Sequence, residues 1–134
     1  MEFINILLIE DNPGDILLTQ EMLEEIELPH ELESITNGEA AIDHLTNISE
    51  NPHFTRPDLI LLDINIPKKN GHEILSFTKN NSKLKEIPVF ILTTSSSPID
   101  MEKCRENNAQ DYFIKPLEED RFREAVIRQL NFNF

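Results

Sequence analysis

Four short apolar runs, spread along the chain, each end directly at a charged or hydroxyl-bearing residue. They are residues 6–9 before Glu10 and Asp11, residues 59–62 before Asp63, residues 89–92 before Thr93 and Thr94, and residues 112–114 before Lys115. Short apolar runs with helical patterns between them are typical of the buried strands of a parallel sheet. In an open sheet of this kind, ligands bind outside the carboxyl ends of the strands. We therefore expect three acids, a hydroxyl and an ammonium to meet there.

The spacing of these runs predicts an α/β fold in which strands and helices alternate. With a weaker strand at residues 31–35, the expected architecture is flavodoxin-like: a doubly wound, five-stranded parallel sheet with five helices on both faces. The default strand order for five such units is 2-1-3-4-5, which places the first and third strands side by side. Glu10, Asp11 and Asp63 are then neighbours in space, although more than fifty residues separate them in sequence.

Between the strands, apolar positions three and four residues apart predict amphipathic helices. We expect them near residues 16–26, 39–48, 73–80, 98–107 and 117–130. Asn37-Gly38 alone would suggest a hairpin turn, but the helix-forming residues that follow favour a helix start. Residues 49–57 contain two prolines and no periodicity, which predicts a long surface loop. Asn108 suits the left-handed end of the fourth helix.

Composition and charge exclude several classes of protein. At 134 residues the chain is expected to form one domain, residues 1–134, and no apolar run approaches the roughly 20 residues that a membrane span needs. A formal charge of −13 repels polyanions and argues against nucleic-acid binding. No basic and apolar leader begins the chain, so we expect a cytoplasmic protein. Cys104 is the only cysteine, which excludes an internal disulfide.

The expected convergence of three carboxylates favours a metal site. An isolated aspartate at a strand end is most often a turn residue. Glu10, Asp11 and Asp63 together would repel one another unless a cation or a proton intervenes. Oxygen ligands, completed by a backbone carbonyl such as that of Asn65, suit a hard ion. We therefore expect Mg²⁺.

A metal-bound carboxylate that faces a hydroxyl and an ammonium is suited to phosphoryl transfer, which needs positioning and charge neutralisation. Asp63 is the expected nucleophile, because carboxylates form aspartyl-phosphate intermediates. Lys115 would hold one phosphate oxygen as a point charge, and Thr93 would donate its hydroxyl to another. Taken alone, a lysine is more often a solvated surface residue, and a lone threonine could be a turn hydroxyl; their positions after buried runs favour the site.

Four motifs, in order along the chain, resemble the receiver domain of two-component response regulators. They are residues 8–12, residues 61–71, residues 92–95 and residues 112–116. The resemblance covers nearly the whole chain. Residues 12–15 and the loop at 49–57 are most similar to the single-domain, CheY-like receivers associated with phytochrome kinases.

The resemblance implies a role for each of these residues. Asp63 would accept a phosphoryl group from the phosphohistidine of a sensor histidine kinase. Further implications are Mg²⁺ ligation by Glu10, Asp11, Asp63 and the Asn65 carbonyl, phosphate binding by Thr93 and Lys115, a switch aromatic at Tyr112, and a cis bond between Lys115 and Pro116. The chain departs from the family pattern at Glu10, where aspartate is commoner, and at Thr94, where a small alanine is common.

The resulting hypothesis is a stand-alone receiver without an output domain. Its output is a conformational change passed to a separate partner or through a homodimer. A small Mg²⁺-dependent aspartyl-phosphate hydrolase is the alternative, although Asn65 stands where such enzymes usually carry a second acid. A nucleotide-binding fold lacks support because the three glycines lie far apart.

The last residues of the chain allow more than one interpretation. Phe132 and Phe134 lie where chains normally fray, and exposed aromatics there forgo burial. They predict a docking tail, used together with the face of the fourth helix, fifth strand and fifth helix. The alternatives are a disordered tail and a tail packed on the domain's own core.

Overall fold

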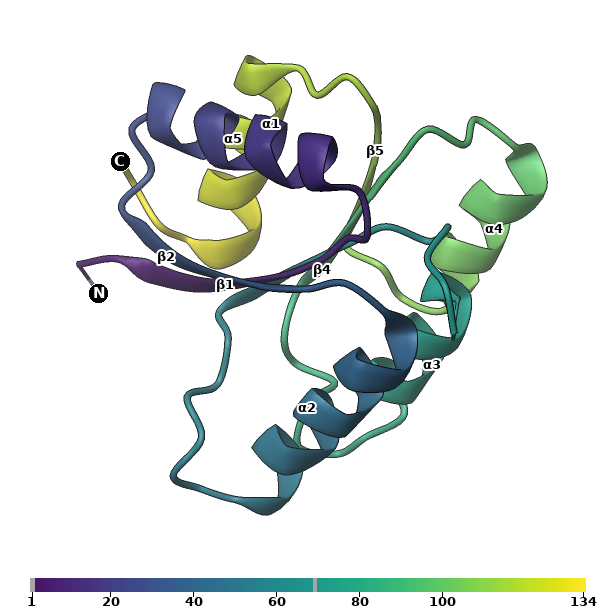
Figure 1. Ribbon diagram of the computed structural model, residues 1–134. Coiled ribbons are helices and arrows are strands. Elements are labelled where there is room, and N and C mark those ends of the chain that lie inside the picture. Colours follow the sequence, from purple (N-terminus) through teal and green to yellow (C-terminus); the bar gives the residue numbers. More distant parts are fainter. Residues whose placement is uncertain (1, 69) are drawn as a thin grey trace.

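The computed structural model describes residues 2–68 and 70–134, so Met1 and Lys69, the latter within the 61–71 motif, lie outside the described residues. Strands and helices alternate along this part of the chain (Figure 1). The strands are β1 (Ile4–Ile9), β2 (His30–Ile35), β3 (Leu59–Leu62), β4 (Val89–Thr93) and β5 (Asp111–Ile114). The helices are α1 (Pro13–Glu25), α2 (Gly38–Glu50), α3 (Gly71–Lys79), α4 (Pro98–Glu106) and α5 (Glu119–Leu130). None of these described helices is long and apolar enough to cross a membrane.

The five described strands are parallel and lie in the order β2-β1-β3-β4-β5, which confirms the expected topology. Ile9 at the end of β1 pairs with Leu62 at the end of β3. The residues that follow β1 and β3 therefore leave the sheet next to each other. Thr93 at the end of β4 pairs with Ile114, so Lys115, the next residue, lies beside the end of β4.

Helices cover both faces of the sheet, α1 and α5 on one side and α2, α3 and α4 on the other (Figure 1). Because side chains alternate across a strand, each central strand contributes to two apolar cores. On β1, Ile6 and Leu8 join the core that α1 and α5 cover, whereas Leu7 and Ile9 join the core that α2 and α3 cover. Burial on both faces explains why β3 consists only of leucine and isoleucine.

Polar side chains define the starts of four helices. Each accepts a hydrogen bond from the backbone N–H three residues later, and the four are Asn12, Asn37, Asn70 and Ser97. Asn37-Gly38 is therefore a helix start, as expected. The cap at Asn70 begins α3 at Gly71 rather than at the predicted Glu73, and Pro13, which suits a first helical position, begins α1 before the predicted residue 16.

Other boundaries also differ from the prediction. The expected loop at 49–57 begins only after Glu50. Ser49 donates its hydroxyl to the Thr46 carbonyl within α2, and the C-cap of the helix is Asn51, the residue before Pro52. Helix α5 begins at Glu119. Asn108 has a φ of 64°, the left-handed conformation expected at the end of α4, and the Lys115–Pro116 bond is cis, as the resemblance implies.

The C-terminal tail packs on the domain itself. Phe132 is 8% exposed within the core that α1 and α5 cover, and the half-buried Phe134 lies against it with ring centroids 6.0 Å apart. Arg123 of α5 lies 4.7 Å over the Phe134 ring and donates a hydrogen bond to the Phe134 carbonyl. The prediction of a docking tail is therefore wrong, and the tail instead packs on the domain's own core. Burying an aromatic ring stabilises by about 1.5–3 kcal/mol, and the domain's own core provides that burial.

Candidate functional site

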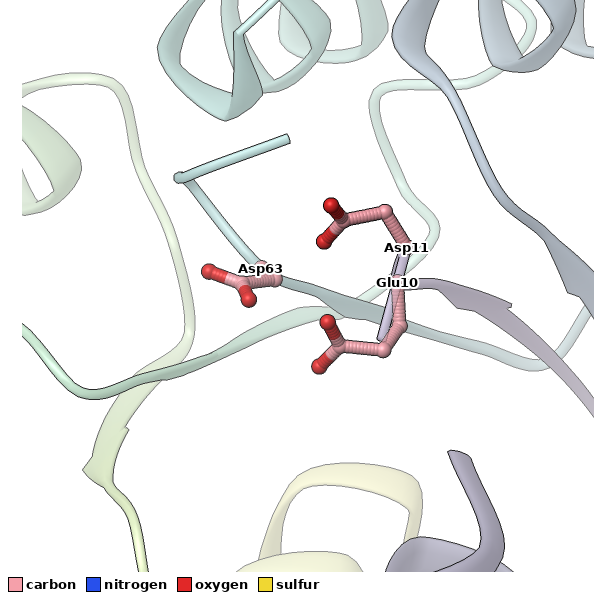
Figure 2. Close-up of side chains that lie close together, drawn as sticks. All are labelled: Glu10, Asp11 and Asp63. Atoms are coloured by element: carbon pink, nitrogen blue, oxygen red, sulfur yellow. The ribbon is translucent and has the colours of Figure 1, made fainter. Parts of the chain in front are cut away.

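Three carboxylates gather at the carboxyl ends of β1 and β3 (Figure 2). Glu10 and Asp11 directly follow β1, Asp63 directly follows β3, and one oxygen of each carboxylate lies within 4.8 Å of the others. Glu10 and Asp63 are buried, whereas Asp11 is exposed to solvent. The sheet topology brings the three acids together, as the sequence predicts.

Lys115, directly after β5, places its ammonium among these acids. Its Nζ donates to Glu10, to Oδ2 of Asp63 at 3.3 Å and to Oδ2 of Asp15 at 2.9 Å. We call Glu10, Asp11, Asp63 and Lys115 the acid pocket. One cation against three carboxylates leaves this pocket with an excess of negative charge when all three acids are ionised.

The burial of the acid pocket changes its protonation. Burial raises the pKa of the Glu10 carboxyl to about 7; the hydrogen bond from Lys115 lowers it and the charge of Asp63 raises it. Burial by itself would lower the pKa of Lys115, but hydrogen bonds to Glu10 and Asp15 outweigh burial and raise it. The lysine is therefore charged. Its single positive charge does not balance the three carboxylates, so an additional cation would reduce the repulsion between them.

Asn65 and Thr93 lie beside Asp63. The Asn65 N–H donates to Oδ1 of Asp63 at 2.9 Å, and the Asn65 side-chain amide is 3.5 Å from the Thr93 hydroxyl oxygen. Thr93 ends β4 and is fully buried, whereas Thr94 is exposed. The structure thus brings Asp63, Asn65, Thr93 and Lys115 to one edge of the sheet.

A second set of side chains continues from Thr93 along the loop between β4 and α4. The Thr93 hydroxyl oxygen accepts from the Ser95 N–H at 3.2 Å, and the Ser95 hydroxyl donates to Asp100 at 2.7 Å. His72 Nε2, from α3, lies 2.9 Å from the other oxygen of Asp100, and the Tyr112 hydroxyl donates to the Ser95 carbonyl at 2.9 Å. We call Ser95, Asp100, His72 and Tyr112 the loop network.

The loop network is held by directional hydrogen bonds. Hydrogen bonds from Ser95 and His72 keep the pKa of the Asp100 carboxyl below its usual value. Ser95 therefore links the Thr93 hydroxyl to the Tyr112 hydroxyl through two hydrogen bonds, one at its N–H and one at its carbonyl.

Asp15, His72 and Asp100 are site residues that sequence reasoning misses. Asp15 is explained from sequence as a favourable charge in the first turn of α1, and nothing in its spacing indicates Lys115, 100 residues away. His72 and Asp100 are 28 residues apart, and only the packing of α3 near α4 reveals their contact. The one usable signal is that each lies in the first turn of a helix that follows a site-bearing strand.

A parallel sheet of this order, with acids after β1 and β3, a hydroxyl at the end of β4 and a lysine after β5, defines the class of CheY-like receivers. Comparison with known families leads to the same class. Residues 6–127 match the response regulator receiver domain, and the chain belongs to that family.

Individual relatives make the identification more specific. Response regulator Rcp1 of Synechocystis sp. is 43% identical over 110 residues, which are 82% of this chain and 75% of that protein. The structure of the Mn²⁺-bound form of Rcp1 has a TM-score of 0.80 at 37% identity, and the match covers 98% of this chain and 97% of that one. The phosphorylated cyanobacterial phytochrome response regulator RcpA has a TM-score of 0.81 at 34% identity, with the same coverage. The predicted similarity to phytochrome-associated receivers is confirmed.

Family membership establishes a signalling domain of two-component systems rather than a classical enzyme. The hydrolase alternative therefore has no support. The acidic cluster is compatible with a divalent metal site, and the similar protein Rcp1 has a structure in an Mn²⁺-bound form.

Proposed function

We propose that the chain is a phosphorylatable receiver in which Asp63 accepts a phosphoryl group from the phosphohistidine of a sensor histidine kinase. The position of the Asp63 carboxylate carries this proposal. It follows a central strand, is 7% exposed, and has Lys115 Nζ 3.3 Å from one oxygen and the Asn65 N–H 2.9 Å from the other. A carboxylate oriented from both sides is prepared for attack, because little freedom remains to be lost in the transition state.

The acid pocket fits a divalent cation by the chemistry of its donors. Glu10, Asp11 and Asp63 offer only oxygen atoms, and their excess charge suits a small hard ion. We propose Mg²⁺ as the cofactor, held by these three side chains and by the backbone carbonyl of Asn65. When bound, Mg²⁺ would reduce the repulsion between the acids and an incoming phosphoryl group.

The chain's own residues account for the remaining parts of the transfer. A carboxylate oxygen of Asp63 attacks phosphorus, so that an O–P bond forms while the P–N bond breaks and its electron pair leaves with the donor imidazole. The Lys115 ammonium and the Thr93 hydroxyl donate to two of the phosphoryl oxygens and stabilise their charge. The two residues directly follow β5 and end β4, strands that lie on the opposite side of β3 from β1 in the sheet order.

Thr93 and Tyr112 are the proposed switch. A phosphoryl group brings about two negative charges to the pocket, which would draw the Thr93 hydroxyl toward Asp63. Ser95 would follow, because its N–H binds Thr93, and the Tyr112 hydroxyl would lose or change its contact with the Ser95 carbonyl. Phosphorylation of Asp63 would then change the conformation of the surface formed by α4 and β5, where a partner protein can bind.

The proposed partners are a phytochrome-like sensor histidine kinase and a separate downstream protein. The kinase assignment is supported by the similarity to RcpA, a phytochrome response regulator. The surface of α4 and β5 carries the exposed apolar side chains Ile99, Met101 and Ile114, which suit a protein contact or a homodimer. The acidic chain offers no comparable support for nucleic-acid binding.

Intact-mass spectrometry after incubation with acetyl phosphate and Mg²⁺ tests the phosphoryl-acceptor assignment. The wild type should gain one phosphoryl group and Asp63→Asn none. Asp43→Asn, which removes an exposed aspartate of α2, is the matched control and should behave as wild type. A full phosphoryl gain in Asp63→Asn would contradict the proposal.

A further inference from the structure

Asp15 contributes a fourth carboxylate to the surroundings of Lys115. It lies in the first turn of α1, and its Oδ2 accepts from Lys115 Nζ at 2.9 Å, a shorter distance than the 3.3 Å between Lys115 Nζ and Asp63. The backbone of Asp15 is held independently of this contact, since its N–H donates to the Asn12 cap at 3.1 Å and its carbonyl accepts from the Thr19 hydroxyl. The Asp15 side chain is therefore fixed beside Lys115 by the start of α1.

The three donors of the Lys115 ammonium are all in use. They go to Glu10, Asp15 and Asp63, and an ammonium has no fourth hydrogen to offer. A phosphoryl group on Asp63 can bind Lys115 only if at least one of these contacts is exchanged. The phosphoryl group and the existing carboxylates thus compete for the same donors.

Exposure identifies which contact can be given up most easily. The side chain of Asp15 is 30% exposed, whereas those of Glu10 and Asp63 are 2% and 10% exposed. Water can solvate the Asp15 carboxylate after release, but it can hardly reach that of Glu10, and leaving a buried charge without a partner is costly. Exchanging the Lys115–Asp15 contact for a contact between Lys115 and a phosphoryl oxygen therefore costs the least free energy of the three possible exchanges.

We infer that Asp15 is a positioning residue that holds Lys115 in the unphosphorylated receiver and is displaced from it by the phosphoryl group. This inference rests on the proposed function of Asp63. Competition with Asp15 lowers the affinity of the pocket for a phosphoryl group and thereby sets how readily the phosphorylated state forms. A purely structural role, through the charge of Asp15 at the start of α1, would change stability but not this affinity.

The affinity for beryllofluoride, which mimics a phosphoryl group on a carboxylate, tests the inference. Titrations of the wild type, Asp15→Asn and Glu21→Gln in Mg²⁺ would be followed by fluorine NMR. Asparagine keeps the size and the backbone bonds of Asp15 but removes the charge, and we expect about 2- to 10-fold tighter binding, as suits a partly exposed ion pair. Glu21→Gln removes an exposed charge further along the same helix and should stay within about twofold of wild type.

The outcomes separate this inference from the proposed function. No beryllofluoride binding to the wild type would contradict the acceptor role of Asp63. Binding to the wild type with equal or weaker binding to Asp15→Asn, or an equal gain in Glu21→Gln, would overturn the role of Asp15 alone. A crystal structure of the wild-type beryllofluoride complex gives a test that needs no variant. The Asp15–Lys115 contact should be broken there, and a retained contact would overturn the inference.

Discussion

The acid pocket and the loop network lie on either side of Thr93, yet different forces hold them together. The acid pocket sets three carboxylates against one lysine, and its geometry depends on charge. The loop network has a single carboxylate, Asp100, whose two oxygens are bound by a hydroxyl and an imidazole. Among the described residues, no buried polar side-chain atom lacks a hydrogen-bond partner, so the network is satisfied as it stands.

Because one region holds unbalanced charge and the other holds satisfied hydrogen bonds, the two regions respond to different changes. An excess of negative charge makes the pocket sensitive to cations, protons and phosphoryl groups. The loop network has no comparable excess of negative charge to attract a cation, and its hydrogen bonds respond instead to any displacement of its members. Thr93 lies between the two regions, since its hydroxyl contacts Ser95 of the loop network and also Asn65, whose N–H donates to Asp63 of the acid pocket.

The largest expected difference concerns Mg²⁺ affinity. Asp11→Asn removes one of the three carboxylates without leaving an unpaired buried group, because Asp11 is exposed. We expect about 10- to 100-fold weaker Mg²⁺ binding by calorimetry, since a charged oxygen ligand is lost. Ser95→Ala, in the loop network, should bind Mg²⁺ as wild type does. Equal losses in the two variants would show that the regions are not separate.

The pH dependence of stability should also arise in the pocket. The pKa of Glu10 is about 7 in the folded protein against an ordinary value of 4.5, so the folded state binds this proton more tightly. Its contribution to the free energy of unfolding is fully present below pH 4.5 and is lost as the pH rises through about 7, by up to about 3 kcal/mol.

Urea unfolding in EDTA, across this pH range, measures the effect. Glu10→Gln should remove most of the decline, because its amide does not titrate. Asp100→Asn, a change in the loop network, should keep it. A decline of the same size in Glu10→Gln would assign the effect to another group.

A smaller effect is expected when the loop network is altered. Asp100→Asn replaces one of the two carboxylate oxygens, which contact His72 and Ser95 separately, by an NH₂ group that cannot accept, and this should lower the free energy of unfolding by about 1 kcal/mol. Urea unfolding with saturating Mg²⁺ would measure it. Glu102→Gln, an exposed change on the same helix, is the control and should leave the midpoint near that of wild type. Equal midpoints in all three proteins would show that the network does not stabilise α4.

Sequence predicts the pocket better than the network for a physical reason. Glu10, Asp63 and Lys115 follow strands whose apolar runs are distinctive, and the strand order alone brings them together. His72, Asp100 and Asp15 lie on helices, and their contacts depend on how each helix approaches the sheet edge. No local pattern encodes that approach.

The ends of elements were hard to predict for the same kind of reason. Ser49 and Glu50 are polar and suit either a helix or a loop, and the hydroxyl bond from Ser49 to Thr46 appears only once the helix exists. The packing of Phe132 likewise depends on a core formed by residues distant in sequence.

Amide hydrogen exchange in wild type and Thr93→Ala, with and without beryllofluoride and Mg²⁺, tests the central claim most directly. That claim is that a group added in the acid pocket reaches the loop network through Thr93. Binding to wild type should change exchange in the pocket and along residues 94–116. In Thr93→Ala, which must first be shown to bind, the pocket should still change while residues 94–116 change little. Equal changes along residues 94–116 in both proteins would contradict the account.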